Sequence, residues 1–103
     1  MPAQLIHREK HVLSDGSVVE MVIWQLPENT PAQPHGIKYR LYYGTKEGHS
    51  LVRYDNESGK GDHRHYEDRE DTYGFVDVET LVQDFLADVA RVRRLDHEKE
   101  NKD

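Results

Sequence analysis

Two extended runs separated by an Asp-Gly pair constrain this chain more than any other feature. Leu5 to Leu13 and Val18 to Leu26 are strand-like, and Ser14-Asp15-Gly16-Ser17 lies between them. Asp-Gly between extended segments is typical of a two-residue β-hairpin turn. The sequence therefore predicts an antiparallel hairpin at residues 5–26. Its second run is apolar at almost every position, which favours a strand buried on both faces in the middle of a sheet.

Two further extended runs continue the predicted sheet. They follow residues 27–36, which contain three prolines and no hydrophobic periodicity, as is typical of a surface loop. Side chains from Ile37 to Tyr43 alternate with a period of two, as in a half-buried strand, and His49 to Tyr54 returns as a fourth strand. Short turns between successive strands favour an antiparallel meander. Residues His63 to Glu67 either extend this sheet or form a loop at its rim.

The C-terminal segment has the spacing of an amphipathic helix. Asp77 is suited to cap its N-terminus, and apolar residues then recur three and four positions apart. These apolar residues are Val78, Leu81, Val82, Phe85, Val89 and Val92. The stripe predicts a helix to about Leu95 that covers the sheet. We therefore expect an α+β fold, an antiparallel four- to five-stranded meander covered by one C-terminal helix, with a single domain at residues 1–95 and a frayed charged tail at 96–103.

Composition limits the classes of protein that this chain can belong to. The 103 residues, 35% of them hydrophobic, furnish a single small core, which excludes a two-domain enzyme. The absence of cysteine excludes disulfides, thiolate zinc sites and thiol catalysis, and it fits a reducing cytoplasm. No apolar run reaches the roughly 20 residues of a membrane span, and we expect no signal peptide. A net charge of −6 argues against a global basic surface, so a nucleic acid would be held locally or the partner would be a protein.

The densest group of reactive side chains follows the fourth predicted strand. If this segment is extended, His63 and His65 share one face, about 6.5 Å apart. Two imidazoles at that spacing can act together, because one can accept a proton while the other donates one near neutral pH. This arrangement suits cleavage of RNA without a metal ion, in which one histidine takes the ribose 2′-hydroxyl proton and the other protonates the leaving oxygen.

Neighbouring residues complete this hypothesis. Asp62 would orient one imidazole, and Lys60 and Arg64 would stabilise the phosphoryl charge. Gly59 and Gly61 would let backbone N–H groups approach the phosphate.

Three other readings of the same region stay open. His63 and His65 can be two metal ligands, with Glu67, Asp62, His35 or His49 as a third. The segment from Lys60 to Asp68 can instead be a solvated charged loop. Lastly, the protein can be a binding module without turnover that uses its acidic helix face or an exposed edge strand.

One stretch of the chain resembles a known family. Tyr39-Arg40-Leu41-Tyr42-Tyr43, Leu51-Val52-Arg53-Tyr54-Asp55-Asn56 and Gly59-Lys60-Gly61-Asp62-His63-Arg64-His65 are similar to the TumE-like family of small prokaryotic proteins, formerly described as a domain of unknown function. The resemblance covers roughly residues 36–90. It implies the toxin of a type II toxin–antitoxin pair, whose partner is a helix-turn-helix antitoxin encoded beside it. Ribonuclease action is the expectation by analogy with other small toxins.

Together the residues and the resemblance predict a growth-inhibiting, metal-independent endoribonuclease of the cytoplasm that uses no cofactor. The catalytic residues would be His63, His65, Asp62, Lys60 and Arg64. The substrate contacts would be Asp55, Asn56, Gly59, Gly61, Tyr42 and Tyr66, of which Tyr42 lies on the predicted face of Lys38 and Arg40 and is suited to stack on RNA. A metal-dependent nuclease and a non-catalytic module remain the alternatives.

Overall fold

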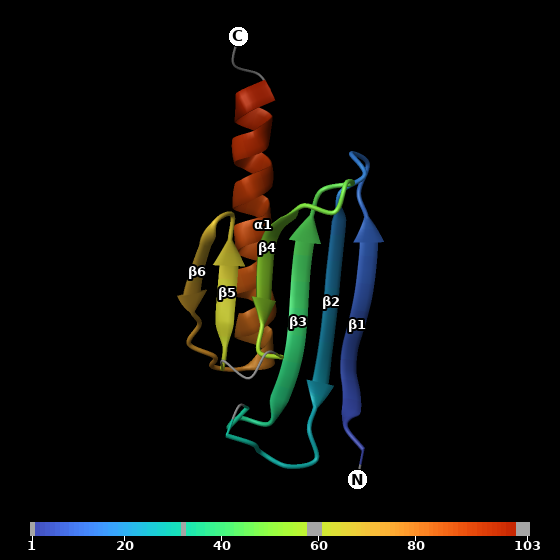
Figure 1. The fold of residues 1–103 in the computed structure, drawn as a ribbon. Coiled ribbons are helices and arrows are strands. Elements are labelled where there is room, and N and C mark those ends of the chain that lie inside the picture. Colours follow the sequence, from blue (N-terminus) through green and yellow to red (C-terminus); the bar gives the residue numbers. More distant parts are fainter. Residues whose placement is uncertain (1, 32, 58–60, 101–103) are drawn as a thin grey trace.

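The structure is a computed structural model that describes residues 2–31, 33–57 and 61–100. In this part of the chain, six strands form one antiparallel sheet with a single helix against it (Figure 1). In chain order, and in the same order across the sheet, the strands are β1 (Gln4–Val12), β2 (Val18–Gln25), β3 (Ile37–Gly44), β4 (Ser50–Asp55), β5 (His63–Tyr66) and β6 (Arg69–Thr72), and the helix is α1 (Val78–Glu100). The expected α+β meander is confirmed, with six strands instead of four or five.

The first hairpin forms as predicted, but its loop is one residue longer. The Leu13 amide donates to the Ser17 carbonyl over 2.8 Å, and the Gly16 amide donates to the Leu13 carbonyl over 2.9 Å. Gly16 has a φ of 86°, the left-handed conformation that closes three-residue hairpin loops. The Asp15 carboxylate accepts a hydrogen bond from the Ser17 amide over 2.9 Å and holds the turn.

The second strand is buried on one face only, which corrects the expectation of burial on both. Val19, Met21 and Ile23 lie in the core, whereas Val22 and Trp24 are half-buried on the opposite face. The reason is architectural, because α1 covers one side of the sheet. The apolar run is almost continuous because Val22 and Trp24, on the side away from α1, are half-buried and are apolar as well.

The fifth strand is paired on both sides, with β4 and with β6. The sequence left the state of β5 open and did not predict β6. The turn between them consists of Glu67 and Asp68, and Glu67 has a φ of 55°. Glycine and asparagine adopt this left-handed conformation most readily, and either residue would have indicated a turn. Glutamate gives no such signal, so the sequence did not predict this turn.

The helix anchors the core against β3 and β4. Asp77 caps it as expected, since its carboxylate accepts a hydrogen bond from the Thr80 amide over 2.7 Å. Phe85 is fully buried and meets the Tyr54 ring edge-on, with 5.8 Å between centroids. The helix continues to Glu100, past the expected end near Leu95, while residues 101–103 of the expected tail lie outside the described residues. The domain boundary at residue 95 stays a prediction.

No helix in the described part of the chain combines the length and the apolar character that crossing a membrane requires.

We predict that Phe85→Ala lowers the free energy of unfolding by about 3–5 kcal/mol, because it removes a buried ring from the helix–sheet contact. The matched control is Leu86→Ala on the next position of the helix, where the side chain is 42% exposed and the loss should be below about 1 kcal/mol. Urea denaturation of the purified proteins measures both values. Equal losses for the two variants would contradict the described packing.

Candidate functional site

The strand register decides which side chains share the face turned away from α1, here called the open face. Directly opposite residues of antiparallel strands project from the same side of a sheet. Tyr54 packs against the helix, so its neighbours Arg53 and Asp55 project from the open face. They pair with His65 and His63, which therefore lie on the open face too.

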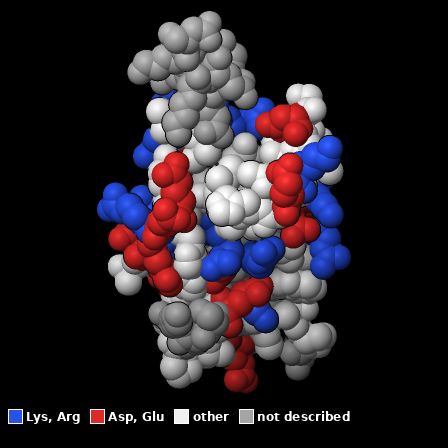
Figure 2. Space-filling view, turned by 45° about the horizontal axis from the view of Figure 1, so that its top comes forward, with Lys and Arg blue, Asp and Glu red and all other residues white. Residues whose placement is uncertain are grey.

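Two neighbouring rows of side chains run across the open face from β1 to β6. The His65 row consists of Lys10, Glu20, Tyr42, Arg53, His65 and Glu70. The His63 row consists of Arg8, Val22, Arg40, Asp55, His63 and Thr72. Figure 2 shows that positive and negative side chains are interspersed on this side of the molecule, as the modest net charge suggests.

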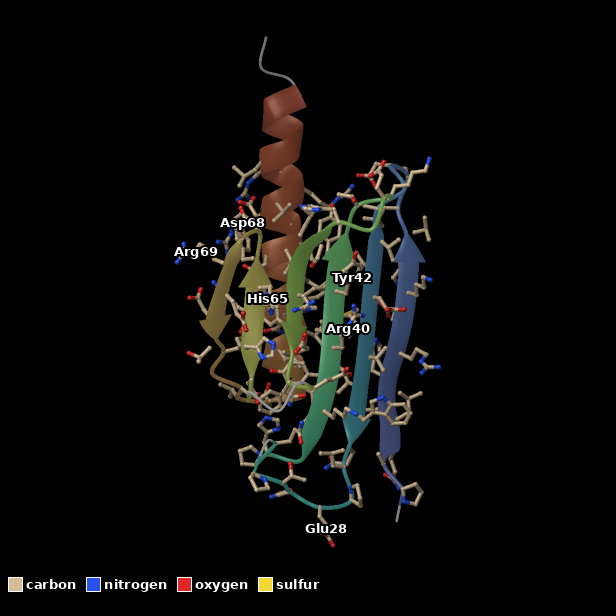
Figure 3. The ribbon with its side chains drawn as sticks, in the orientation of Figure 1. Glu28, Arg40, Tyr42, His65, Asp68 and Arg69 are labelled. Carbon is tan, nitrogen blue, oxygen red and sulfur yellow. The ribbon has the colours of Figure 1, made fainter. Side chains whose placement is uncertain are left out.

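The middle of these two rows is hollowed. A shallow depression of about 350 Å³ is lined by Arg40, Arg53, Asp55, Glu57, His63, His65 and Glu70. Figure 3 shows Arg40 on β3 and His65 on β5 on the near side of the sheet, away from the helix. The structure therefore brings both predicted histidines to one depression.

The two imidazoles lie close together and nearly perpendicular, with 5.2 Å between ring centroids and 75° between planes. His65 is half-buried, and its Nε2 lies 2.8 Å from Nη2 of Arg53. An arginine only donates hydrogen bonds, so Nε2 of His65 must accept this one and carry no proton. Partial burial and the positive charge of Arg53 lower the pKa of His65 from its ordinary value of 6.5. His65 thus has the properties of a neutral base with a lone pair on the open face.

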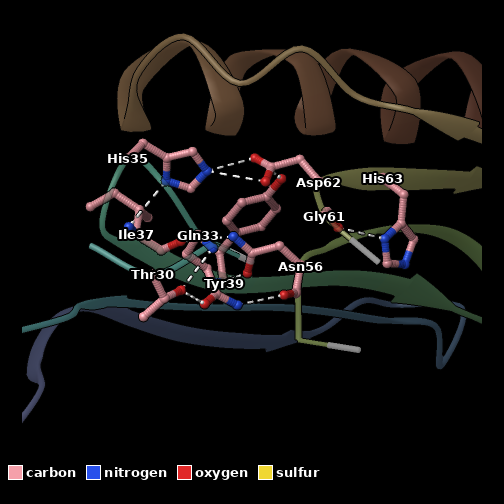
Figure 4. A network of polar contacts seen from close by, with 9 residues as sticks. All are labelled: Thr30, Gln33, His35, Ile37, Tyr39, Asn56, Gly61, Asp62 and His63. Carbon is pink, nitrogen blue, oxygen red and sulfur yellow. Dashed lines mark hydrogen bonds and ion pairs between the residues drawn. The ribbon is translucent and has the colours of Figure 1, made fainter. Parts of the chain in front are cut away.

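His63 is bound in the opposite way. It is buried, with its Nε2 2.9 Å from the Asp55 carboxylate and its Nδ1 3.0 Å from the Gly61 carbonyl. The Gly61 carbonyl only accepts hydrogen bonds, so Nδ1 of His63 carries a proton and donates it there, while the Asp55 carboxylate lies beside the other ring nitrogen. Gly61 reaches this position with a φ of 82°, in the left-handed region (Figure 4). One histidine is therefore held as a hydrogen-bond acceptor and the other as a donor.

Asp55 joins the two halves of the site. Besides His63, its carboxylate meets Arg53, with 2.8 Å between Nε and Oδ2. The Arg53 N–H does not point at that oxygen, so the contact is an ion pair without hydrogen-bond geometry, and Nε has no hydrogen-bond partner among the described residues. Asp55 therefore occupies the orienting position beside an imidazole that the sequence assigned to Asp62.

Asp62 orients a different histidine, which corrects its expected place. Its carboxylate lies 2.8 Å from Nε2 of His35 and accepts a hydrogen bond from the Tyr39 hydroxyl over 3.0 Å (Figure 4). Burial and this carboxylate raise the pKa of Tyr39. His35 also stacks on Phe75, with 4.0 Å between ring centroids. Asp62 thus fastens the proline-rich loop to β3, away from the depression.

Asn56 likewise holds the fold together instead of facing a substrate. It is fully buried, its carboxamide oxygen accepts from the Tyr39 amide over 3.0 Å, and its NH2 group donates to the Ile37 carbonyl over 2.7 Å. Its backbone carbonyl accepts from the Gln33 side chain over 2.8 Å. Every polar group of the Asn56 side chain is thus used inside the protein (Figure 4).

Two more expected site residues lie on the helix side of the sheet. Arg64 pairs in register with Tyr54, and its guanidinium lies 3.4 Å from the buried Asp88 carboxylate. Tyr66 packs beneath Arg91 of the helix, 5.5 Å from ring centroid to guanidinium carbon. Strand alternation separates both from the histidines, because neighbouring residues of a strand face opposite ways.

The cations of the depression are Arg40 and Arg53, and neither was among the expected site residues. The signal that would have found them is the pairing of the predicted strands, because it sets both arginines on the histidine face. Lys60 and Gly59, expected to bind phosphate, lie outside the described residues. Tyr42 does lie on the open face, half-exposed, with the Arg40 guanidinium 5.1 Å above its ring.

A third potential metal ligand is Glu70 and not one of the four expected residues. Ligand atoms of His63, His65 and Glu70 lie within 4.8 Å of one another. However, both nitrogens of His63 are engaged, and the Arg53 guanidinium holds positive charge 2.8 Å from Nε2 of His65. A divalent cation would therefore have to displace Arg53 to bind Nε2 of His65.

Comparison with known proteins returns one family. The family model described as Toxin TumE matches residues 2–93. Neither the curated proteins nor the solved structures include a significant match to this chain.

We predict that the pKa of His65 lies below its ordinary value of 6.5, because burial and Arg53 both disfavour the charged ring. Arg53→Met should move this titration to higher pH by removing the neighbouring positive charge. Arg8→Met, which removes a cation at the far end of the His63 row, should leave it in place. Titration of the histidine ring signals by NMR measures all three proteins, and a wild-type His65 that titrates above 6.5 would contradict the described pair.

Proposed function

Because this chain belongs to the TumE toxin family, we propose that it is the toxin of a type II toxin–antitoxin pair and cleaves RNA without a metal ion. The proposed work is done by His65 as general base and His63 as general acid. Arg53 and Arg40 would bind the phosphate in the place that the sequence analysis gave to Arg64. Growth inhibition would follow from loss of cytoplasmic RNA.

The observation that carries this proposal is the complementary state of the two imidazoles. His65 accepts a hydrogen bond from Arg53, and His63 contacts two acceptors, Asp55 and the Gly61 carbonyl. General acid–base catalysis needs one group whose lone pair can accept a proton and one with a proton to give. Both rings line the same depression, together with two guanidinium groups that can stabilise extra phosphoryl charge.

The proposed reaction is an internal transfer to the ribose 2′-oxygen. Nε2 of His65 takes the proton of the 2′-hydroxyl, which replaces Arg53 as its partner, and the 2′-oxygen forms a bond to phosphorus. The bond from phosphorus to the 5′-oxygen breaks, and that oxygen takes a proton from His63. The products are a 2′,3′-cyclic phosphate and a 5′-hydroxyl.

Freed from His65, Arg53 can turn its guanidinium to the phosphate. Asp55 would keep the charged forms of both His63 and Arg53 in place during this exchange. An antitoxin of the helix-turn-helix class is the proposed neutralising partner, and it would act by covering or distorting the depression.

A metal-dependent nuclease is the second candidate, favoured by the convergence of Glu70 on the two histidines. In that case Arg53 would have to leave the depression when the metal binds. The two candidates share their residues and differ in their response to a chelator.

We predict cleavage of a labelled single-stranded RNA by the purified protein, unchanged by EDTA. His65→Ala should lower the rate at least 100-fold, in line with the usual contribution of a general base. The matched control, His49→Ala, makes the same change at an exposed loop residue and should keep the full rate. Cleavage abolished by EDTA would establish the metal-dependent alternative, and no cleavage under any condition would leave a non-catalytic binding module.

A further inference from the structure

The open face has cationic side chains outside the depression as well as within it. Arg8 and Lys10 project from β1 and are exposed, at the far end of the two rows that contain the histidines. Four inter-strand spacings separate β1 from β5, roughly 19 Å. Neither residue can reach a phosphate held between His63 and His65, so the proposed catalysis does not account for them.

Between these two ends lies an aromatic side chain that is available from the open face. Tyr42 is half-exposed on β3, and its ring lies against Gly44, where an added Cβ would collide with it. Arg40 covers part of the ring and also meets Glu20, 3.4 Å away, so the one acidic side chain between Lys10 and Tyr42 in the His65 row is partly neutralised. The ring of Tyr42 thus lies near the middle of the open face, with cationic side chains on either side of it.

We propose that a single strand of RNA crosses the open face along these rows, from the depression at β4 and β5, over Tyr42, to Arg8 and Lys10 on β1. This inference rests on the proposed ribonuclease and names the form of its substrate. A base would stack on Tyr42, and Arg8 and Lys10 would each contact a phosphate outside the cleaved bond.

A single strand fits this surface better than a duplex does. A duplex hides its bases and is held mainly through phosphates, which calls for a continuous basic surface. On this face Glu20, Asp55 and Glu70 lie among the cations, and the net charge of the chain is −6. An unpaired strand can add stacking on a partly exposed ring to a few phosphate contacts, as other sheet surfaces that bind single strands do.

The cations on the helix side of the sheet lie away from this path. Figure 2 shows positive side chains in the middle of the open face and along its right-hand edge, the edge at which β1 lies in Figure 1. On the helix side, Arg64 and Arg91 are engaged by the buried Asp88 carboxylate. Arg69 and Arg94 are exposed but belong to β6 and α1, outside both rows.

The test measures binding apart from cleavage. The probe is a fluorescein-labelled 2′-O-methyl RNA 12-mer of mixed sequence, which lacks the attacking hydroxyl, used alone and annealed to its complement. Anisotropy titrations over a range of salt concentrations compare the wild type with Arg8→Gln/Lys10→Gln and with Arg69→Gln/Arg94→Gln. The second pair is the matched control, because it removes the same charge away from the proposed path.

For the single strand we expect Arg8→Gln/Lys10→Gln to bind about tenfold more weakly at low salt. Its plot of log affinity against log salt should also be shallower by about 1.4, because each lost phosphate contact removes about 0.7 from the slope for single strands. Tyr42→Leu should weaken binding with no change in slope, and the control pair should bind like the wild type. These variants must retain the wild-type circular dichroism spectrum.

Equal loss in the control pair, unchanged binding by Arg8→Gln/Lys10→Gln, no binding of the single strand, or tighter binding of the duplex would each overturn the proposed path. Failure of the ribonuclease proposal gives a different result. In that case a cleavable RNA of the same sequence would be bound with the expected variant effects and left intact.

Discussion

The pairing of β4 with β5 is the constraint on which the candidate site depends. It sets Arg53 opposite His65 and Asp55 opposite His63, so four groups that would be separate on the chain meet on one face. A slip of one residue would turn both histidines toward the helix and bring Arg64 to the open face. The register is held by the opposite side of the same strands, where Tyr54 is fully buried against Phe85. Core packing on one face therefore determines the chemistry available on the other.

Electrostatics then distinguishes two identical side chains. His65 faces a guanidinium and is held as a neutral acceptor, whereas His63 faces a carboxylate and a carbonyl and is held as a donor. Asp55 links the two states, because the same carboxylate balances both Arg53 and His63. The difference arises from partners on the neighbouring strand β4 and at Gly61, and not from the His-x-His motif itself. A pair of histidines at this spacing on an isolated strand would lack it.

The sequence predicts the fold better than it predicts the site. Asp-Gly at 15–16, the cap at Asp77 and the apolar stripe of the helix are local signals, and each forms the expected element. β6 was missed because the left-handed residue of its turn is Glu67, which gives no such signal. Arg64 and Asp62 were expected beside the histidines because they are near in sequence, but alternation sends Arg64 to the helix side and Asp62 binds His35. Arg53 and Asp55 lie beside the histidines instead, and only the pairing of strands identifies them.

The ends left on cleaved RNA test the central claim most directly, namely that a neutral His65 activates the ribose 2′-hydroxyl. Mass spectrometry of the products formed from a defined single-stranded RNA identifies both ends of each fragment. Attack by the 2′-oxygen leaves a 2′,3′-cyclic phosphate on one fragment and a 5′-hydroxyl on the next, and this is the result that the account predicts. Fragments with a 3′-hydroxyl and a 5′-phosphate would show attack by water instead, and they would contradict it.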